Sequence, residues 1–122
     1  MSVLDATVLL AWLQGEQGAD RVEPLLSDAV VSAANWSEVL QHIRQTGRDA
    51  DAVGTLLRAR GVTVEPVTEQ DAVVAARYWS PDGTPLSLPD RLCLALATRL
   101  GVEAVTVERR WAATPVAVRV IR

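Results

Sequence analysis

Short apolar runs rich in valine alternate along this chain with longer stretches of helical spacing, and this alternation limits the possible folds more than any other feature. Strands are expected at residues 2–4, 29–32, 62–67, 103–106 and 116–121. Helices are expected at residues 7–14, 20–27, 35–45, 50–59, 69–79 and 88–100, several of them followed closely by glycine. Strands that alternate with helices favour βαβ units, and therefore a mostly parallel central sheet of 4–5 strands with helices on both faces.

The composition favours a single domain, residues 1–122, in a reducing compartment. The chain has 122 residues, 49% of them apolar, which is enough to bury a core. Its one cysteine, Cys93, cannot form an internal disulfide. No apolar run approaches the roughly 20 residues needed to span a bilayer. The N-terminus has no positive region and meets Asp5 at once, unlike a signal peptide. We therefore expect a cytoplasmic protein that does not contact membranes.

Several function classes are disfavoured by what the sequence lacks. The net charge of −3 argues against a protein that binds nucleic acid by bulk electrostatics. All 12 basic residues are arginine, so no phosphate-binding loop of the Gly-Lys-Ser/Thr type exists, and no Gly-x-Gly-x-x-Gly occurs. A nucleotide-binding α/β module therefore has little support. His42 is the single histidine, which leaves no histidine-rich metal site.

Four acidic residues lie just after expected strands. Asp5 follows the first strand directly, and Glu38 lies one turn into the helix after the second. Asp90 lies near the start of the apolar helix 88–100, and Glu108 comes two residues after the fourth strand. In open α/β sheets the carboxyl ends of the strands share one edge, and ligands bind there. The four acids are therefore expected to converge.

Helix capping is the alternative explanation for these acids. Residues 35–38 and 87–90 both fit the capping-box pattern, and residues 68–71 show the same pattern without any expected site. Taken singly, each acid is better explained as a cap. Asp5 is interpreted differently, because it ends an apolar strand and no cap position is evident. A carboxylate there would be partly buried, and a metal ion is one partner that offsets the cost of burying its charge.

Four blocks of sequence together resemble a known family. They are Val-Leu-Asp-Ala-Thr at 3–7, Asn-Trp-Ser-Glu-Val at 35–39, Leu-Ser-Leu-Pro-Asp-Arg at 86–91 and Thr-Val-Glu-Arg-Arg-Trp at 106–111. In this order they resemble the motifs of PIN domains of the VapC-like toxin type. The blocks span nearly the whole chain. The resemblance implies a PIN-like three-layer α/β/α sandwich.

The same resemblance implies a function. It implies a metal-dependent endoribonuclease that cleaves RNA phosphodiester bonds by metal-activated water, and the toxin component of a toxin–antitoxin pair. The partners implied are a cognate antitoxin protein, an RNA substrate and a second copy in a homodimer. The cofactor implied is Mg²⁺ or Mn²⁺, ions that prefer carboxylate and water oxygens.

The resemblance also assigns roles to individual residues. The acidic quartet matches Asp5, Glu38, Asp90 and Glu108, with Asp5 and Asp90 as the expected direct metal ligands. Polar residues that orient ligands or water match Thr7, Asn35 and Thr106, and phosphate contacts are expected from Arg91 and Arg109. Glu108 departs from the family pattern, where aspartate is usual. A catalytically degenerate PIN-like domain that acts as a binding or assembly module therefore stays open as an alternative.

Overall fold

Five parallel strands form the central sheet of the computed structural model, which describes residues 1–83, 85–113 and 116–121. The strands are β1 (Ser2–Leu4), β2 (Ala29–Ser32), β3 (Thr63–Glu65), β4 (Ala104–Thr106) and β5 (Val118–Val120). Their order in the sheet is β3-β2-β1-β4-β5, and every neighbouring pair is parallel. Val3 in the central strand is in register with Val30 on one side and with Ala104 on the other.

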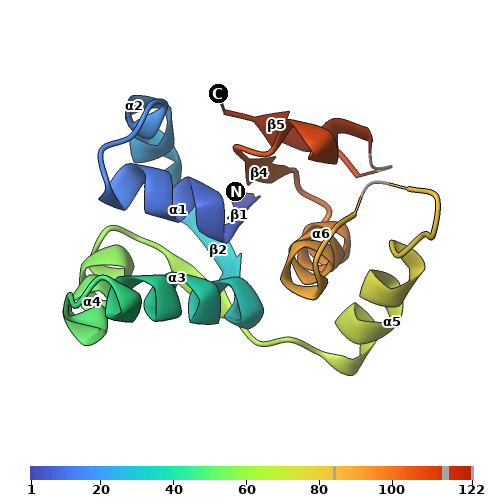
Figure 1. Cartoon of the computed structure of the whole chain (residues 1–122), viewed down its shortest axis with the longest axis horizontal. Helices are drawn as coiled ribbons and strands as arrows, with labels where there is room; N and C mark the ends of the chain where they lie inside the picture. Colours follow the sequence, from blue (N-terminus) through green and yellow to red (C-terminus); the bar gives the residue numbers. More distant parts are fainter. Residues whose placement is uncertain (84, 114–115, 122) are drawn as a thin grey trace.

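Helices cover both faces of this sheet (Figure 1). They are α1 (Ala6–Leu13), α2 (Ala19–Val22), α3 (Ala33–Gln45), α4 (Ala50–Ala59), α5 (Glu69–Arg77) and α6 (Leu88–Leu100), with 3₁₀ helices η1 (Glu23–Asp28) and η2 (Arg109–Ala113). Successive side chains of a strand point to opposite faces. Leu4 accordingly packs with residues of α1, α3 and α4, whereas the preceding Val3 packs with α6. The expected three-layer α/β/α fold is confirmed.

The order of the strands reverses at β1, and this places the site. The chain runs outward from β1 through β2 to β3, then crosses to the other side of β1 to form β4 and β5. Crevices at such a switch point, beyond the carboxyl ends of the strands, are where open α/β sheets bind ligands. Asp5 follows β1 directly and therefore lies at the switch point.

Most expected elements are present with small shifts at their ends. The strand 29–32 and the helices 50–59 and 88–100 have the expected bounds. The expected helix 20–27 is instead α2 followed by η1, with Pro24 in the first turn of η1, where its missing N–H is tolerated. The strand expected at 62–67 is shorter and ends before Pro66. Residue 84 of the loop between α5 and α6 lies outside the described part of the chain.

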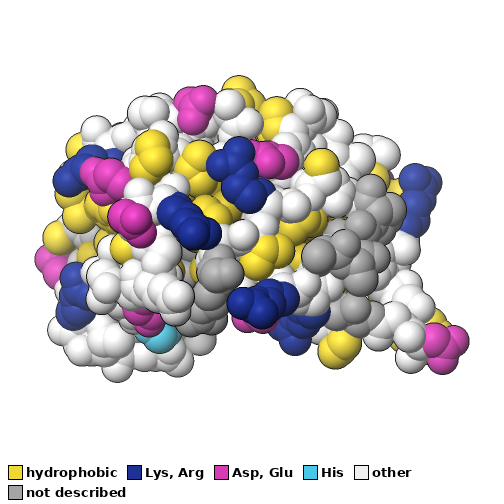
Figure 2. Space-filling model, turned by 90° about the horizontal axis from the view of Figure 1, so that it is seen from above, with side chains coloured by type: hydrophobic (Ala, Val, Ile, Leu, Met, Phe, Trp, Pro, Cys, Tyr) yellow, Lys and Arg dark blue, Asp and Glu magenta, His cyan; other side chains and the backbone are white. Residues whose placement is uncertain are grey.

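Charge is distributed over the surface without a broad patch of one sign on the face drawn in Figure 2, where arginine and acidic side chains lie interspersed. This agrees with the small net charge of −3. Among the described helices, none is long and apolar enough to cross a membrane.

Candidate metal centre

Asp5 is a buried carboxylate at the junction of β1 and α1, with 2% of its surface exposed. Its Oδ1 accepts hydrogen bonds from the Thr7 hydroxyl at 2.6 Å and from the Val8 backbone N–H at 3.0 Å. Its Oδ2 accepts one from the Thr106 hydroxyl at 2.8 Å. A carboxylate has about four acceptor positions, so three bonds leave room for a further partner.

The expectation that Asp5 is not a helix cap is wrong. Asp5 has the extended backbone of an N-cap and accepts from Val8 N–H in the first turn of α1, because α1 begins at the very next residue. The cap does not neutralise the side chain, since the three groups that donate to it carry no charge. Burial raises the pKa of Asp5 to about 6; the hydrogen bonds from Thr7, Thr106 and Val8 lower it in part, and the charge of Asp90 raises it.

The two threonines connect Asp5 to the segment after β4. The Thr106 hydroxyl donates to Asp5 and also accepts from the Glu108 backbone N–H at 3.0 Å. The Thr7 hydroxyl accepts a longer bond from the Val107 backbone N–H at 3.4 Å. Strand pairing of β1 with β4 therefore brings residues about a hundred positions apart onto one carboxylate.

Glu38 and Asn35 lie in the first half of α3 and face the start of α6. The capping box expected at 35–38 is wrong, because α3 begins at Ala33 with Ser32 as its N-cap. Asn35 is instead fully buried, and its Nδ2 donates to Glu38 Oε1 at 2.9 Å and to the Pro89 carbonyl at 3.2 Å. Burial raises the pKa of Glu38; the hydrogen bond from Asn35 lowers it, and the charge of Asp90 raises it.

Asp90, the third expected acid, lies in the first turn of α6. It forms the capping box expected at 87–90: Ser87 N–H donates to Asp90 Oδ2 at 3.0 Å, and Asp90 N–H donates to Ser87 Oγ at 3.2 Å. The cap uses Oδ2 and leaves Oδ1 for another partner. The charge of Asp90 raises the pKa of both Asp5 and Glu38, and the carbonyl of the preceding Pro89 accepts a hydrogen bond from Asn35, so Asp90 faces the start of α3.

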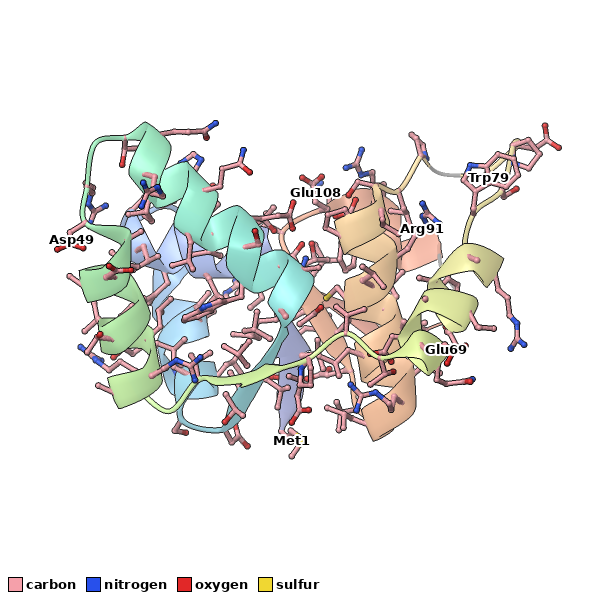
Figure 3. The ribbon with its side chains drawn as sticks, turned by 90° about the horizontal axis from the view of Figure 1, so that it is seen from below. Met1, Asp49, Glu69, Trp79, Arg91 and Glu108 are labelled. Atoms are coloured by element: carbon pink, nitrogen blue, oxygen red, sulfur yellow. The ribbon has the colours of Figure 1, made fainter. Side chains whose placement is uncertain are left out.

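Glu108, the fourth expected acid, has 39% of its side chain accessible, compared with 16% for Asp90. Figure 3 shows it beside the end of α6 that carries Asp90. Arg110, two residues further on, approaches both acids: its Nη2 is 3.8 Å from Asp90 Oδ2, and its Nε is 3.7 Å from Glu108 Oε2. The sequence analysis missed Arg110, although the pair of arginines after the fourth acid was a visible signal.

Arg91, which was expected to contact phosphate, makes a hydrogen bond to another helix of the fold. Its side chain is partly buried, and Nη1 donates to the Ala75 carbonyl at 3.2 Å, which connects α6 to α5. Arg109 is exposed.

The residues present fit a hard divalent cation. The donors are carboxylate oxygens, which Mg²⁺ and Mn²⁺ prefer. Among the described residues, no cationic group pairs with the buried Asp5, and none donates a hydrogen bond to the buried Asn35 Oδ1. In the part of the chain that is described, no three Asp, Glu, His or Cys side chains stand close enough to enclose an ion together. Mg²⁺ usually keeps several waters and needs only one or two carboxylates, so Asp5 and Asp90 would suffice.

The fold and the site together define a class: a three-layer α/β domain that collects carboxylates at the switch point of a parallel sheet. A sequence profile of the PIN domain matches residues 2–117, and the chain therefore belongs to the PIN domain family. No sequence among the curated proteins matches significantly.

Solved structures with the same fold extend over almost the whole chain. A toxin–antitoxin complex from Klebsiella pneumoniae gives a TM-score of 0.81 at 19% identity, covering 100% of this chain and 98% of that chain. VapBC2 from Rickettsia felis, bound to a DNA fragment from its promoter, gives 0.80 at 11% identity, covering 99% and 98%. VapC20 from Mycobacterium tuberculosis, a toxin that cleaves the sarcin–ricin loop, gives 0.70 at 18% identity, covering 85% and 87%.

Proposed function

We propose that this chain is a metal-dependent endoribonuclease and the toxin component of a toxin–antitoxin pair. The observation that carries the proposal is the buried carboxylate of Asp5, which has no cationic partner among the described residues and whose pKa is raised by burial and by the charge of Asp90. The family membership and the neighbours named as toxin–antitoxin complexes support the proposal.

In this proposal Asp5 and Asp90 hold the cation, while Glu38 and Glu108 act through water. Bound Mg²⁺ or Mn²⁺ supplies activation of water and neutralises charge on the phosphate. Thr7 and Thr106 keep the Asp5 carboxylate in place through hydrogen bonds of 2.6 and 2.8 Å. Glu38 has a raised pKa, which brings it closer to neutral pH and suits it to accept a proton from water.

RNA is the proposed substrate because one structural neighbour is named as a toxin that cleaves the sarcin–ricin loop, an RNA. A site at the open edge of a sheet suits single-stranded or looped RNA, whose backbone can bend into it, better than a duplex. An antitoxin protein and a homodimer are proposed as partners, since several neighbours are complexes of toxin and antitoxin.

The test is cleavage of RNA in Mn²⁺, together with growth arrest on expression. We expect Asp5→Asn and Asp90→Asn each to lower the cleavage rate at least about a hundredfold, and EDTA to abolish cleavage. The matched control is Asp20→Asn, an exposed aspartate in α2 that should leave the rate unchanged. If both site variants lose activity only because they unfold in urea far earlier than the control, the acids are caps and the proposal is wrong.

The alternative is a degenerate PIN domain that binds partners without cleaving RNA. The observation that favours it is Glu108, which stands where the family usually has aspartate and is half exposed. Glu108→Asp and Glu108→Ala separate the two functions in the same cleavage assay. An increase in rate for Glu108→Asp would support degeneration, whereas loss of cleavage in Glu108→Ala would make Glu108 part of a working site.

A further inference from the structure

Arg110 lies in η2 with its guanidinium between two acids of the candidate site. Nη2 is 3.8 Å from Asp90 Oδ2, and Nε is 3.7 Å from Glu108 Oε2. Both distances exceed the 2.7–3.2 Å of an N–H···O hydrogen bond. Arg110 is therefore attracted to the two carboxylates by charge and is not fixed to either by hydrogen bonds.

Arg99 shows what a fixed arginine looks like in the same molecule. Its Nε and Nη2 donate to the two carboxylate oxygens of Asp71 at 2.9 and 3.1 Å, and its side chain is 29% exposed. Arg110 makes no such paired hydrogen bonds and is 44% exposed. An arginine held only by longer ion pairs at an open rim can leave when another cation arrives.

The position of Arg110 indicates which cation that is. Within the described residues, Arg110 pairs with two of the four acids, Asp90 and Glu108, and the other two have no ion pair. Arg110 therefore supplies the positive charge that a divalent ion would supply. Two cations at the same carboxylates repel each other, so the ion and the guanidinium compete for Asp90.

We propose that Arg110 is the built-in counter-ion of the metal centre, and that a divalent cation displaces its guanidinium onto a phosphate of the RNA. This inference rests on the function proposed above. A free guanidinium beside a phosphodiester substrate is well suited to this second role, because its planar group of N–H donors matches two phosphate oxygens. Arg110 thus offsets the charge of Asp90 and Glu108 before the cation binds, and it positions the substrate afterwards.

The first test measures Mn²⁺ affinity by electron paramagnetic resonance, without RNA. Arg110→Gln should bind Mn²⁺ about three- to tenfold tighter than wild type, since a competing charge is gone. The control Arg109→Gln removes the same charge from the neighbouring, exposed residue, and its affinity should change less than about twofold. A variant that has merely lost structure would bind more weakly, so equal or weaker binding by Arg110→Gln overturns the inference. A wild type that binds no Mn²⁺ overturns the proposed function instead.

The second test measures binding of a short single-stranded oligoribonucleotide by fluorescence anisotropy, with Ca²⁺ as the cation and intact probe verified on a gel. Arg110→Gln should bind the probe several-fold more weakly, and its slope of log affinity against log salt should be smaller by about 0.7, the value for one lost phosphate contact. Without the cation, the difference between wild type and variant should shrink, because Asp90 and Glu108 then retain the guanidinium. A slope equal to that of wild type in Ca²⁺ overturns the proposal.

Discussion

Asp5 and Asp71 occupy almost the same local environment in two different parts of the molecule. Both are buried, with 2% and 3% of their surfaces exposed, and both lie at the start of a helix. Each takes part in the cap of that helix: Asp5 is the N-cap of α1 and accepts from the Val8 backbone N–H, and Asp71 accepts from the backbone N–H of Thr68, the N-cap of α5. By burial and capping alone the two carboxylates could not be told apart.

The partner of each carboxylate is what differs. Arg99 gives Asp71 two hydrogen bonds and a positive charge, whereas the side chains of the described residues that donate to Asp5 are the uncharged hydroxyls of Thr7 and Thr106. Burial would by itself raise the pKa of Asp71, but Arg99 and Thr68 outweigh it and lower that pKa. For Asp5 burial prevails, and its pKa rises to about 6. A buried acid that is paired with a cationic side chain stabilises the fold. A buried acid without such a partner is available to a cation from solution.

The largest expected effect that tests this contrast is the pH dependence of stability in EDTA. The pKa of Asp5 rises from 3.8 when unfolded to about 6 when folded, so folding is favoured when the acid is protonated. Stability is full below about pH 4 and falls as pH rises through 6, by about 3 kcal/mol for a shift of roughly two units. Urea unfolding of wild type and Asp5→Asn at pH 4.5, 5.5, 6.5 and 7.5 measures this.

Asp5→Asn should lack this decline and become the more stable protein near pH 7. The raised pKa of Glu38 acts in the same direction in both proteins, so only the difference between them reports on Asp5. Asp71→Asn is the control of opposite sign. The pKa of Asp71 is lowered in the fold, so its contribution is present above the unfolded pKa and is lost as pH falls through the folded value. If the difference in unfolding free energy between wild type and Asp5→Asn does not change with pH, the proposed difference between Asp5 and Asp71 is contradicted.

Stabilisation by the cation should be slightly smaller. An ion that binds only the folded state adds about 2.7 kcal/mol at a hundred times its Kd. We expect Mn²⁺ to raise the urea midpoint of wild type and of Asp71→Asn by the same amount. Asp71 is paired with Arg99 and is not expected to bind the ion, so replacing Asp71 should not weaken ion binding. Asp5→Asn should gain little. Equal gains in all three proteins would show that the ion binds elsewhere.

The sequence predicted the layers of the fold well, and the two errors in helix capping fall at one kind of place. The bounds of α4 and α6 were correct because Gly61 and Ser87 mark them clearly. The errors at Asp5 and at the start of α3 both arose where a strand passes into a helix without a loop. At these two places the residue at the end of the strand is also the N-cap of the helix. A sequence prediction that expects a loop between strand and helix places the start of the helix too late.

The candidate site was only partly accessible to sequence reasoning. The places of Asp5 and Asp90 in the fold could be foreseen, because Asp5 directly follows a strand and Asp90 lies in the first turn of a helix; their role as site residues stays a prediction. The side-chain partners could not be foreseen. Nothing in the spacing indicates that Arg99 would pair with Asp71 across 28 residues, or that the turn of η2 would carry Arg110 to Asp90. These contacts depend on how separate elements pack, and they decide which acid is left without a partner.

The smallest effect in this series is the loss of the ion pair at Asp71, and it tests the opposite side of the comparison. Asp71→Asn removes two hydrogen bonds from a charged donor and leaves Arg99 without its carboxylate, so it should destabilise the protein by about 2 kcal/mol at pH 7. The figure is kept low because Arg99 is 29% exposed and can turn to water. Urea unfolding measures it.

The double variant Asp71→Asn/Arg99→Met separates the ion pair from the rest of the site. Removing both charges should restore part of the lost stability, since no uncompensated charge is left between α5 and α6. Cleavage per folded molecule should stay within a few-fold of wild type in the single and the double variant. Asp71 pairs with Arg99 and is not one of the acids of the candidate site. A loss of cleavage as deep as that expected for Asp5→Asn, in protein that is still folded, would mean that the two buried aspartates do not have different roles.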